Sequence, residues 1–209
     1  MTTLLTHPAP TTRRSSASTG RPLDPAVDQR ILSAAREVVG EVGLARTTWA
    51  RIAERSGAGY PTMMRRWDSV HALVLDALRA LRVEVAVDGE TPASEALRAA
   101  LREDLEALAS DARRPFVRTM FFAGARDEAL AHEVRRTLIT PRRERCAALL
   151  ARGVAEGDLR ADLDLDVACA ALWDLVVGAV AIRRRGDPGA FACAVDVLLC
   201  HAFAGAARP

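Results

Sequence analysis

The residues best suited to contact another molecule are gathered between positions 47 and 66. We expect the contacts to come from Thr47, Thr48, Trp49, Tyr60, Pro61, Thr62, Met64, Arg65 and Arg66. The hydroxyls of Tyr60 and Thr62 can hydrogen bond to base edges. The apolar side chains of Pro61 and Met64 suit a thymine methyl group. The two arginines suit phosphates, which give affinity without sequence information. Together these side chains predict contact with DNA.

The elements that must position these side chains are two short helices joined by a tight turn. Thr47 or Thr48 can cap the first helix, because a hydroxyl oxygen accepts an unpaired N–H of the first turn. The turn falls at residues 56–59, where glycine accepts the left-handed backbone of a helix end. The second helix begins near Tyr60 and Pro61, since proline is tolerated in a first turn. This is the helix-turn-helix pattern, whose second helix enters the major groove.

Flanking helices complete the predicted N-terminal domain, residues 24–68. A helix starts at Asp24 and Pro25, a cap followed by proline, and its apolar positions continue at helical spacing to near Gly43. A long helix follows from about residue 69 to residue 87. We expect this helix to join the two domains.

Residues 30–73 also resemble the DNA-binding domain of the tetracycline-repressor (TetR) family. The matching motifs are I-L-x-A-A at 31–35, G-x-x-x-T-T at 43–48, I-A-x-x-x-G at 52–57 and P-T-M-M-R-R-W at 61–67. The resemblance implies a homodimeric, all-helical repressor that binds a DNA operator. It also implies a larger C-terminal domain that binds a small-molecule effector.

Three residues depart from the pattern of that family. Met64 replaces a phosphate-contacting tyrosine, Val70 a phosphate-contacting lysine, and Gly59 a helix-capping serine. Each change removes a polar contact, so DNA affinity depends more on the arginines. The departures leave an alternative open, namely an all-helical interaction protein of the same fold that has lost specific DNA recognition.

The charge of the chain is distributed unevenly. Residues 1–66 contain 10 arginines and 5 acidic residues, whereas residues 67–209 contain 19 arginines and 22 acidic residues. A basic N-terminal part favours a DNA-binding domain there. Residues 1–23 are rich in Thr, Ser, Pro and Arg, which predicts a disordered tail. Its arginines either reach the minor groove or phosphates, as basic arms do, or remain solvated.

Other kinds of chemistry find little support. The sequence has no H-E-x-x-H, G-x-S-x-G or phosphate-binding glycine motif, so we expect no enzyme, no cofactor and no metal site. The cysteines, at positions 146, 169, 193 and 200, are expected to be small buried residues of a reducing cytosol. No secretory segment is evident, and the most apolar run, 167–182, is too short for a membrane span. These features favour a cytoplasmic protein without membrane contact, and the family resemblance implies a bacterial, nucleoid-associated one.

The last two predicted helices suggest how the chain assembles. Residues 167–182 and 190–206 are apolar on nearly all sides, and a helix apolar all round must be buried all round. We expect one face of each to pack on its own domain and the other on a twin subunit, as a homodimer. Two-fold symmetry then places two recognition helices on half-sites about 34–36 Å apart.

The remaining helices of residues 69–209 complete the predicted ligand-binding and dimerisation domain. Helices are expected from about 94 to 110, 116 to 122 and 127 to 153, the last deformed near Pro141. The candidate ligand residues are Phe116, Met120, Phe121, Phe122 and Trp173, which suit a small apolar or aromatic molecule, although each also suits a plain core. The expected fold is all-α, with about nine helices.

Overall fold

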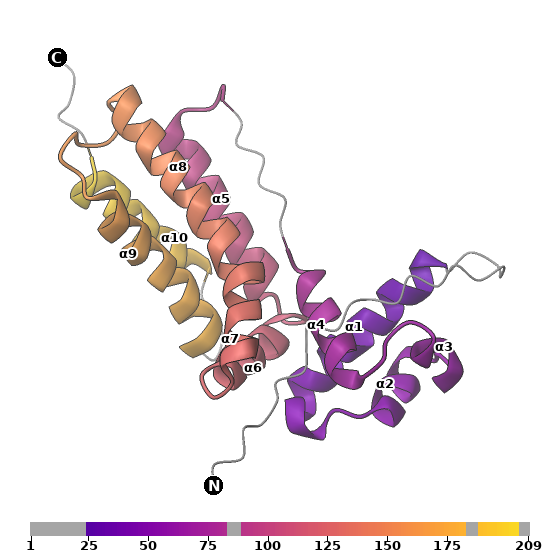
Figure 1. Cartoon of the computed structure of the whole chain (residues 1–209). Helices are drawn as coiled ribbons and strands as arrows, with labels where there is room; N and C mark the ends of the chain where they lie inside the picture. Colours follow the sequence, from indigo (N-terminus) through magenta and orange to yellow (C-terminus); the bar gives the residue numbers. More distant parts are fainter. Residues whose placement is uncertain (1–23, 83–88, 183–187, 205–209) are drawn as a thin grey trace, which may run out of the picture. The chain divides into compact units, whose positions relative to one another are not determined.

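The computed structural model describes residues 24–82, 89–182 and 188–204 (Figure 1). Within these ranges the chain is helical apart from turns and one isolated β-bridge, which confirms the predicted all-α fold. The chain divides into two compact units, residues 1–80 and 81–209. The sequence placed the domain boundary at residue 68, whereas the contacts place the next helix, α4, with the first unit. The predicted tail of residues 1–23 lies outside the described residues.

Helix α1 (Pro25–Val42) forms the base of the first unit. Asp24 caps it as predicted, because its carboxylate accepts a hydrogen bond from the amide of Ala26 at 2.9 Å. Gly43 ends it with φ of 81°, a value that glycine reaches without steric cost. The apolar face of α1 is buried against α2 and α4.

Three short helices complete the first unit, two of them packed on α1 and the middle one on the helix before it. They are α2 (Trp49–Ser56), α3 (Tyr60–Met64) and α4 (Val70–Arg79), with a 3-10 turn at Leu44–Arg46 before them. Thr48 caps α2 by accepting from the amide of Arg51 at 3.4 Å, and Gly57 ends it with φ of 66°. Helix α4 ends at Arg79, earlier than predicted. Residues 83–87 of the predicted helix are outside the described ranges.

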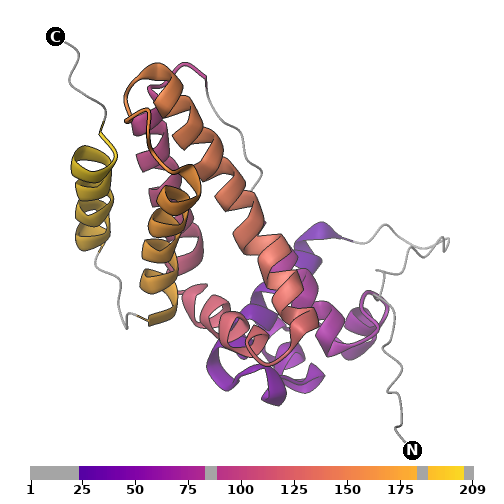
Figure 2. The same ribbon diagram turned by 60° about the vertical axis from the view of Figure 1, so that its left-hand side comes forward.

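The second unit is a bundle in which α5 and α8 run side by side and α9 packs against α8 (Figures 1 and 2). Its helices are α5 (Ala93–Ala109), α6 (Arg114–Gly124), α7 (Glu128–Val134), α8 (Thr140–Glu156), α9 (Leu165–Val177) and α10 (Pro188–Val197). Each of these helices corresponds to a helix, or to part of a helix, that the sequence predicted. No helix in the described ranges is both long and apolar enough to cross a bilayer.

Helices α7 and α8 form one helical segment interrupted by a π-helical turn at Arg135–Ile139. Pro141 follows this turn, and proline lacks the N–H that a regular helix uses. The deformation predicted near Pro141 is therefore present, and its form is a π-turn. Similar turns follow α9 at Gly178–Ile182 and α10 at Leu198–Ala202.

A buried charge cluster joins α5 to α8. Asp104 Oδ1 accepts from Arg142 Nε at 3.0 Å and from a terminal nitrogen of Arg145 at 2.7 Å. Arg142 is 1% exposed and also donates to the carbonyls of Leu138 and Leu81. Burial raises the pKa of Asp104, while the two guanidinium groups oppose that effect. The cluster therefore compensates charges that would be costly if left alone.

The cysteines only partly follow the prediction. Cys146 and Cys169 are buried, and burial raises the pKa of the Cys146 thiol, which makes it a poor nucleophile. Cys193 and Cys200 are exposed in the single chain, which differs from the prediction. Cys193 lies on α10, and Cys200 lies in the turn after it, where its sulfur accepts from a terminal nitrogen of Arg98 on α5 at 3.5 Å.

The buried cluster gives a stability prediction. Asp104→Ala leaves two buried arginines without their shared carboxylate, so we expect the free energy of unfolding to fall by about 3–5 kcal/mol. The matched control is Glu103→Ala, because the Glu103 side chain also pairs with Arg145 but is 60% exposed. Its loss should cost at most about 1 kcal/mol. Urea denaturation measures both, and equal losses would contradict a structural role for the buried pair.

Candidate nucleic-acid interface

Helix α3 is short and depends on tertiary anchors. It spans five residues, fewer than an isolated helix needs in water. Met63 is its inward side chain and is fully buried. Gly59 precedes α3 and supplies no side-chain cap, as its identity implies. The position of α3 is therefore fixed by packing and by the residues that follow it.

Arg66 is one of these anchors. Its side chain is 4% exposed, and its Nε forms an ion pair with Asp28 Oδ1 on α1. A terminal nitrogen of the same guanidinium donates to the carbonyl oxygen of Thr62 at 3.0 Å. The predicted phosphate contact of Arg66 is not supported, because the group is buried and paired within the unit.

Trp67 is a second anchor of α3, and Arg55 links α2 to α1. The indole Nε1 of Trp67 donates to Asp76 on α4 at 2.9 Å, and Trp67 is 4% exposed. Arg55 on α2 forms a two-pronged ion pair with Glu41 on α1, at 2.7 and 2.8 Å. This exposed guanidinium lowers the pKa of the Glu41 carboxyl, mainly through its hydrogen bonds. The helix-turn-helix is thus tied to α1 and α4.

The outer face of α3 carries most of the predicted contact residues. Tyr60 is 50% exposed and Met64 is 39% exposed. Pro61 and Arg65 are also exposed, whereas Thr62 is half-buried. The ring of Trp49 on α2 meets that of Tyr60 edge to face, with centroids 6.1 Å apart. The geometry brings these six side chains onto neighbouring parts of one surface.

The two threonines before α2 have different positions. Thr47 is 8% exposed, and its hydroxyl donates to the carbonyl oxygen of Gly43 at 2.9 Å. Thr47 thus holds the loop between α1 and α2, and its predicted DNA contact is not supported by its burial. Thr48 is exposed, and its hydroxyl oxygen caps α2.

Two further arginines were missed by the sequence reasoning. Arg46 ends the 3-10 turn and Arg51 lies in the first turn of α2, and both are exposed. Neither guanidinium group has a hydrogen-bond or ion-pair partner within the described ranges. The available signal was their position beside Thr48, in the helix that lies across the DNA backbone in a helix-turn-helix.

Comparison with known families agrees with this arrangement. Residues 31–77 match the family model described as bacterial regulatory proteins of the tetR family. Residues 91–197, more than half of the chain, match the model described as a tetracyclin repressor-like C-terminal domain. The chain belongs to the TetR family. It is therefore a DNA-binding transcriptional regulator and not an enzyme.

Relatives of this TetR-family regulator share its length and fold. It is 29% identical over 164 residues to YdeS, an HTH-type transcriptional regulator of Bacillus subtilis, covering 78% of this chain and 81% of that one. A regulator from Saccharomonospora viridis in complex with choline aligns with a TM-score of 0.68 at 15% identity, and the alignment covers 88% of this chain and 100% of that regulator. FadR of Bacillus subtilis in complex with stearoyl-CoA aligns with a TM-score of 0.65 at 16% identity, and the alignment covers 83% of this chain and 97% of FadR. The two structures support the fold alone.

The predicted ligand residues differ widely in exposure. In this TetR-family regulator Phe116 and Met120 are fully buried on α6, and Trp173 on α9 is 6% exposed. Phe121 is half-buried, and Phe122 is 61% exposed on the outer face of α6. Three of the five are therefore core residues in this structure.

The two adjacent arginines give a matched pair for a stability test. Arg66→Ala removes a largely buried ion pair with Asp28, so we expect the free energy of unfolding to fall by about 3 kcal/mol. Arg65→Ala removes an exposed side chain and should change it by less than about 0.5 kcal/mol. Thermal or urea unfolding checks both values. A larger loss for Arg65→Ala would contradict the assignment.

Proposed function

We propose that this TetR-family regulator is a homodimeric repressor that binds a palindromic operator through α3 and is released by a small apolar molecule. The observation that carries the proposal is the outer face of α3, with Tyr60, Pro61 and Met64 exposed beside Arg65. Its inward side chains are anchored, so the exposed ones are held in a fixed orientation. Fixed side chains are what base recognition requires.

The roles within the interface follow from chemistry and exposure. Tyr60 offers a hydroxyl and an aromatic edge to bases, and Pro61 and Met64 offer apolar contact to a thymine methyl group. Arg65, together with the exposed Arg46 and Arg51, contacts phosphates. Thr48, Trp49 and Thr62 support these contacts from α2 and from the first turns of both helices; the hydroxyl of Thr48 is already engaged as a cap.

The dimer is supported by side chains left exposed on α9. The outward positions of α9 and of the turn after it recur at helical spacing, and all except Asp174 are small or apolar: Val167, Ala171, Asp174, Gly178 and Ala181. Val167 is 65% exposed, and a Cβ added at Gly178 meets no atom within 4 Å. An exposed row of this kind suits close packing of helices across a two-fold axis.

Helix α10 offers a similar outward row. Cys193 and Val197 are exposed on one side, and Val197 is 50% exposed. The proposed interface thus combines residues 167–182 and 190–206, of which 205 and 206 lie outside the described ranges.

The chemistry of the effector is the most specific part of the proposal. Relatives of this fold hold molecules as different as choline and stearoyl-CoA, so the fold does not fix the chemistry of the ligand. We propose an apolar molecule bound within the second unit that favours a conformation with weaker operator affinity. The coupling must be reciprocal, so operator DNA also weakens effector binding.

The test of the proposal compares the duplex upstream of the gene with a shuffled duplex in a mobility-shift titration. We expect the upstream duplex to be bound about 10³-fold or more tightly, with two chains in each complex. Equal affinity for both duplexes would contradict specific recognition.

Single substitutions separate affinity from specificity. Arg65→Ala should weaken binding to both duplexes equally and reduce the slope of log affinity against log salt by about 1, because one phosphate contact is lost. Tyr60→Ala should instead reduce the ratio between the two affinities while the slope stays the same. Titrations at several salt concentrations measure both quantities. An unchanged slope for Arg65→Ala, or an unchanged ratio for Tyr60→Ala, would contradict the assigned role.

The dimer interface has its own test. Gly178→Glu adds a charge where the single chain has open space, so it should leave the protomer folded and break the dimer. Ala148→Glu, at an exposed position of α8, is the control and should leave the dimer intact. Sedimentation velocity should give twice the chain mass of 22.5 kDa for the wild type and the control. A wild-type monomer at micromolar concentration would contradict the interface.

A further inference from the structure

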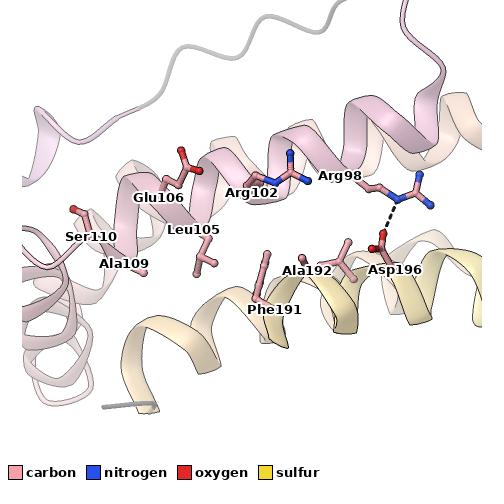
Figure 3. Close-up of a pocket in the computed structure, with 10 residues that line it drawn as sticks. Arg98, Arg102, Leu105, Glu106, Ala109, Ser110, Phe191, Ala192 and Asp196 are labelled. Carbon is pink, nitrogen blue, oxygen red and sulfur yellow. Dashed lines mark hydrogen bonds and ion pairs between the residues drawn. The ribbon is translucent and has the colours of Figure 1, made fainter. Parts of the chain in front are cut away.

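A cleft of about 310 Å³ opens between α5 and α10 (Figure 3). Its apolar walls are Leu105 and Ala109 on α5 and Phe191 and Val195 on α10. Figure 3 shows Leu105 and Phe191 projecting from their helices into the space between them. The volume is at the lower end of the range for small-molecule sites. None of the five ligand residues expected from the sequence lines this cleft.

The charges of the cleft are gathered toward one end. Arg98 forms an ion pair with Asp196 across the cleft at 2.8 Å, so these two charges compensate each other. Arg102 lies one turn further along α5 and is exposed, and within the described ranges it has no hydrogen-bond or ion-pair partner. Glu106 turns its carboxylate away from α10 (Figure 3). Arg102 is therefore a guanidinium without an ion pair beside an apolar slot.

The shape of the cleft is elongated. Its lining on α5 runs from Arg98 to Ser110, which corresponds to about 18 Å along a helix. We propose that this cleft is the effector site of the regulator and takes an elongated apolar molecule that ends in a carboxylate. The carboxylate binds Arg102, and the apolar chain lies along Leu105, Ala109 and Phe191. The inference rests on the proposed function and adds the place and the chemical class of the effector.

The position of the cleft also gives the effector a route to the dimer. Phe191 and Val195 face the cleft, whereas Cys193 and Val197 are exposed on the other side of α10. A molecule between α5 and α10 therefore lies directly behind a helix of the proposed interface. Shifting α10 relative to α5 alters the surface that the partner subunit meets.

The experiment uses decanoate as the probe and 1-decanol as the neutral control of the same chain length. Isothermal titration calorimetry of the full chain should show saturable binding of decanoate, one molecule per chain, and binding of decanol weaker by about tenfold or more. The cation decyltrimethylammonium tests the opposite charge and should bind no better than decanol. In a mobility-shift assay, decanoate should weaken binding to the upstream duplex.

Two variants place the probe in the cleft. Arg102→Met keeps an apolar stem without the charge and should weaken decanoate binding about tenfold or more. Ala109→Trp fills the apolar end and should abolish it. Arg118→Met, at an exposed arginine of α6, is the matched control and should bind decanoate as the wild type does. Thermal unfolding of each variant confirms that it is folded.

The outcomes separate this inference from the proposed function. The cleft assignment is overturned if decanoate does not bind, if decanol or the cation binds equally well, or if Arg102→Met has no effect. It is also overturned if decanoate binds but leaves DNA affinity unchanged. Specific DNA binding without decanoate is measured on the same samples. If specific DNA binding is present, the proposed function stands and only the cleft assignment is rejected. If specific DNA binding is absent, the proposed function itself is contradicted.

Discussion

The five-residue helix α3 cannot hold its own position, and DNA recognition depends on the contacts that fix it. Met63 inserts its side chain into the core, Arg66 pairs with Asp28 on α1, and Trp67 bonds to Asp76 on α4. These three anchors lie on or directly after α3 and point inward. Because they fix the rotation of the helix about its axis, they also determine that Tyr60 is among the residues facing outward.

The second unit has a comparable centre in the cluster of Asp104, Arg142 and Arg145. A carboxylate shared by two arginines ties α5 to α8 and, through the Leu81 carbonyl, fixes the first residue of the unit. With these two helices held together, α9 and α10 can present one face to the bundle and leave the other exposed. The proposed interface and the cleft beside Arg102 both depend on that division.

Local signals in the sequence were sufficient for the helix-turn-helix. Asp24, Thr48 and Gly57 act within one turn of their own position, so their roles as caps and helix ends could be predicted. The roles of Arg65 and Arg66 could not, because both follow the last turn of α3 and only tertiary packing decides which of two neighbouring arginines is buried. The same limit applies to Phe116 and Met120, whose types suit a core and a pocket equally. The cleft is formed by helices some ninety residues apart, and no local pattern marks such a pair.

The central claim is that paired copies of α3, each fixed by its anchors, contact two equivalent half-sites. A hydroxyl-radical footprint of the protein on the duplex upstream of its gene tests it most directly. We expect two protected segments on one face of the duplex, related by the symmetry of the sequence and centred about 34–36 Å apart. A single protected segment, or protection that does not depend on the sequence, would contradict the account.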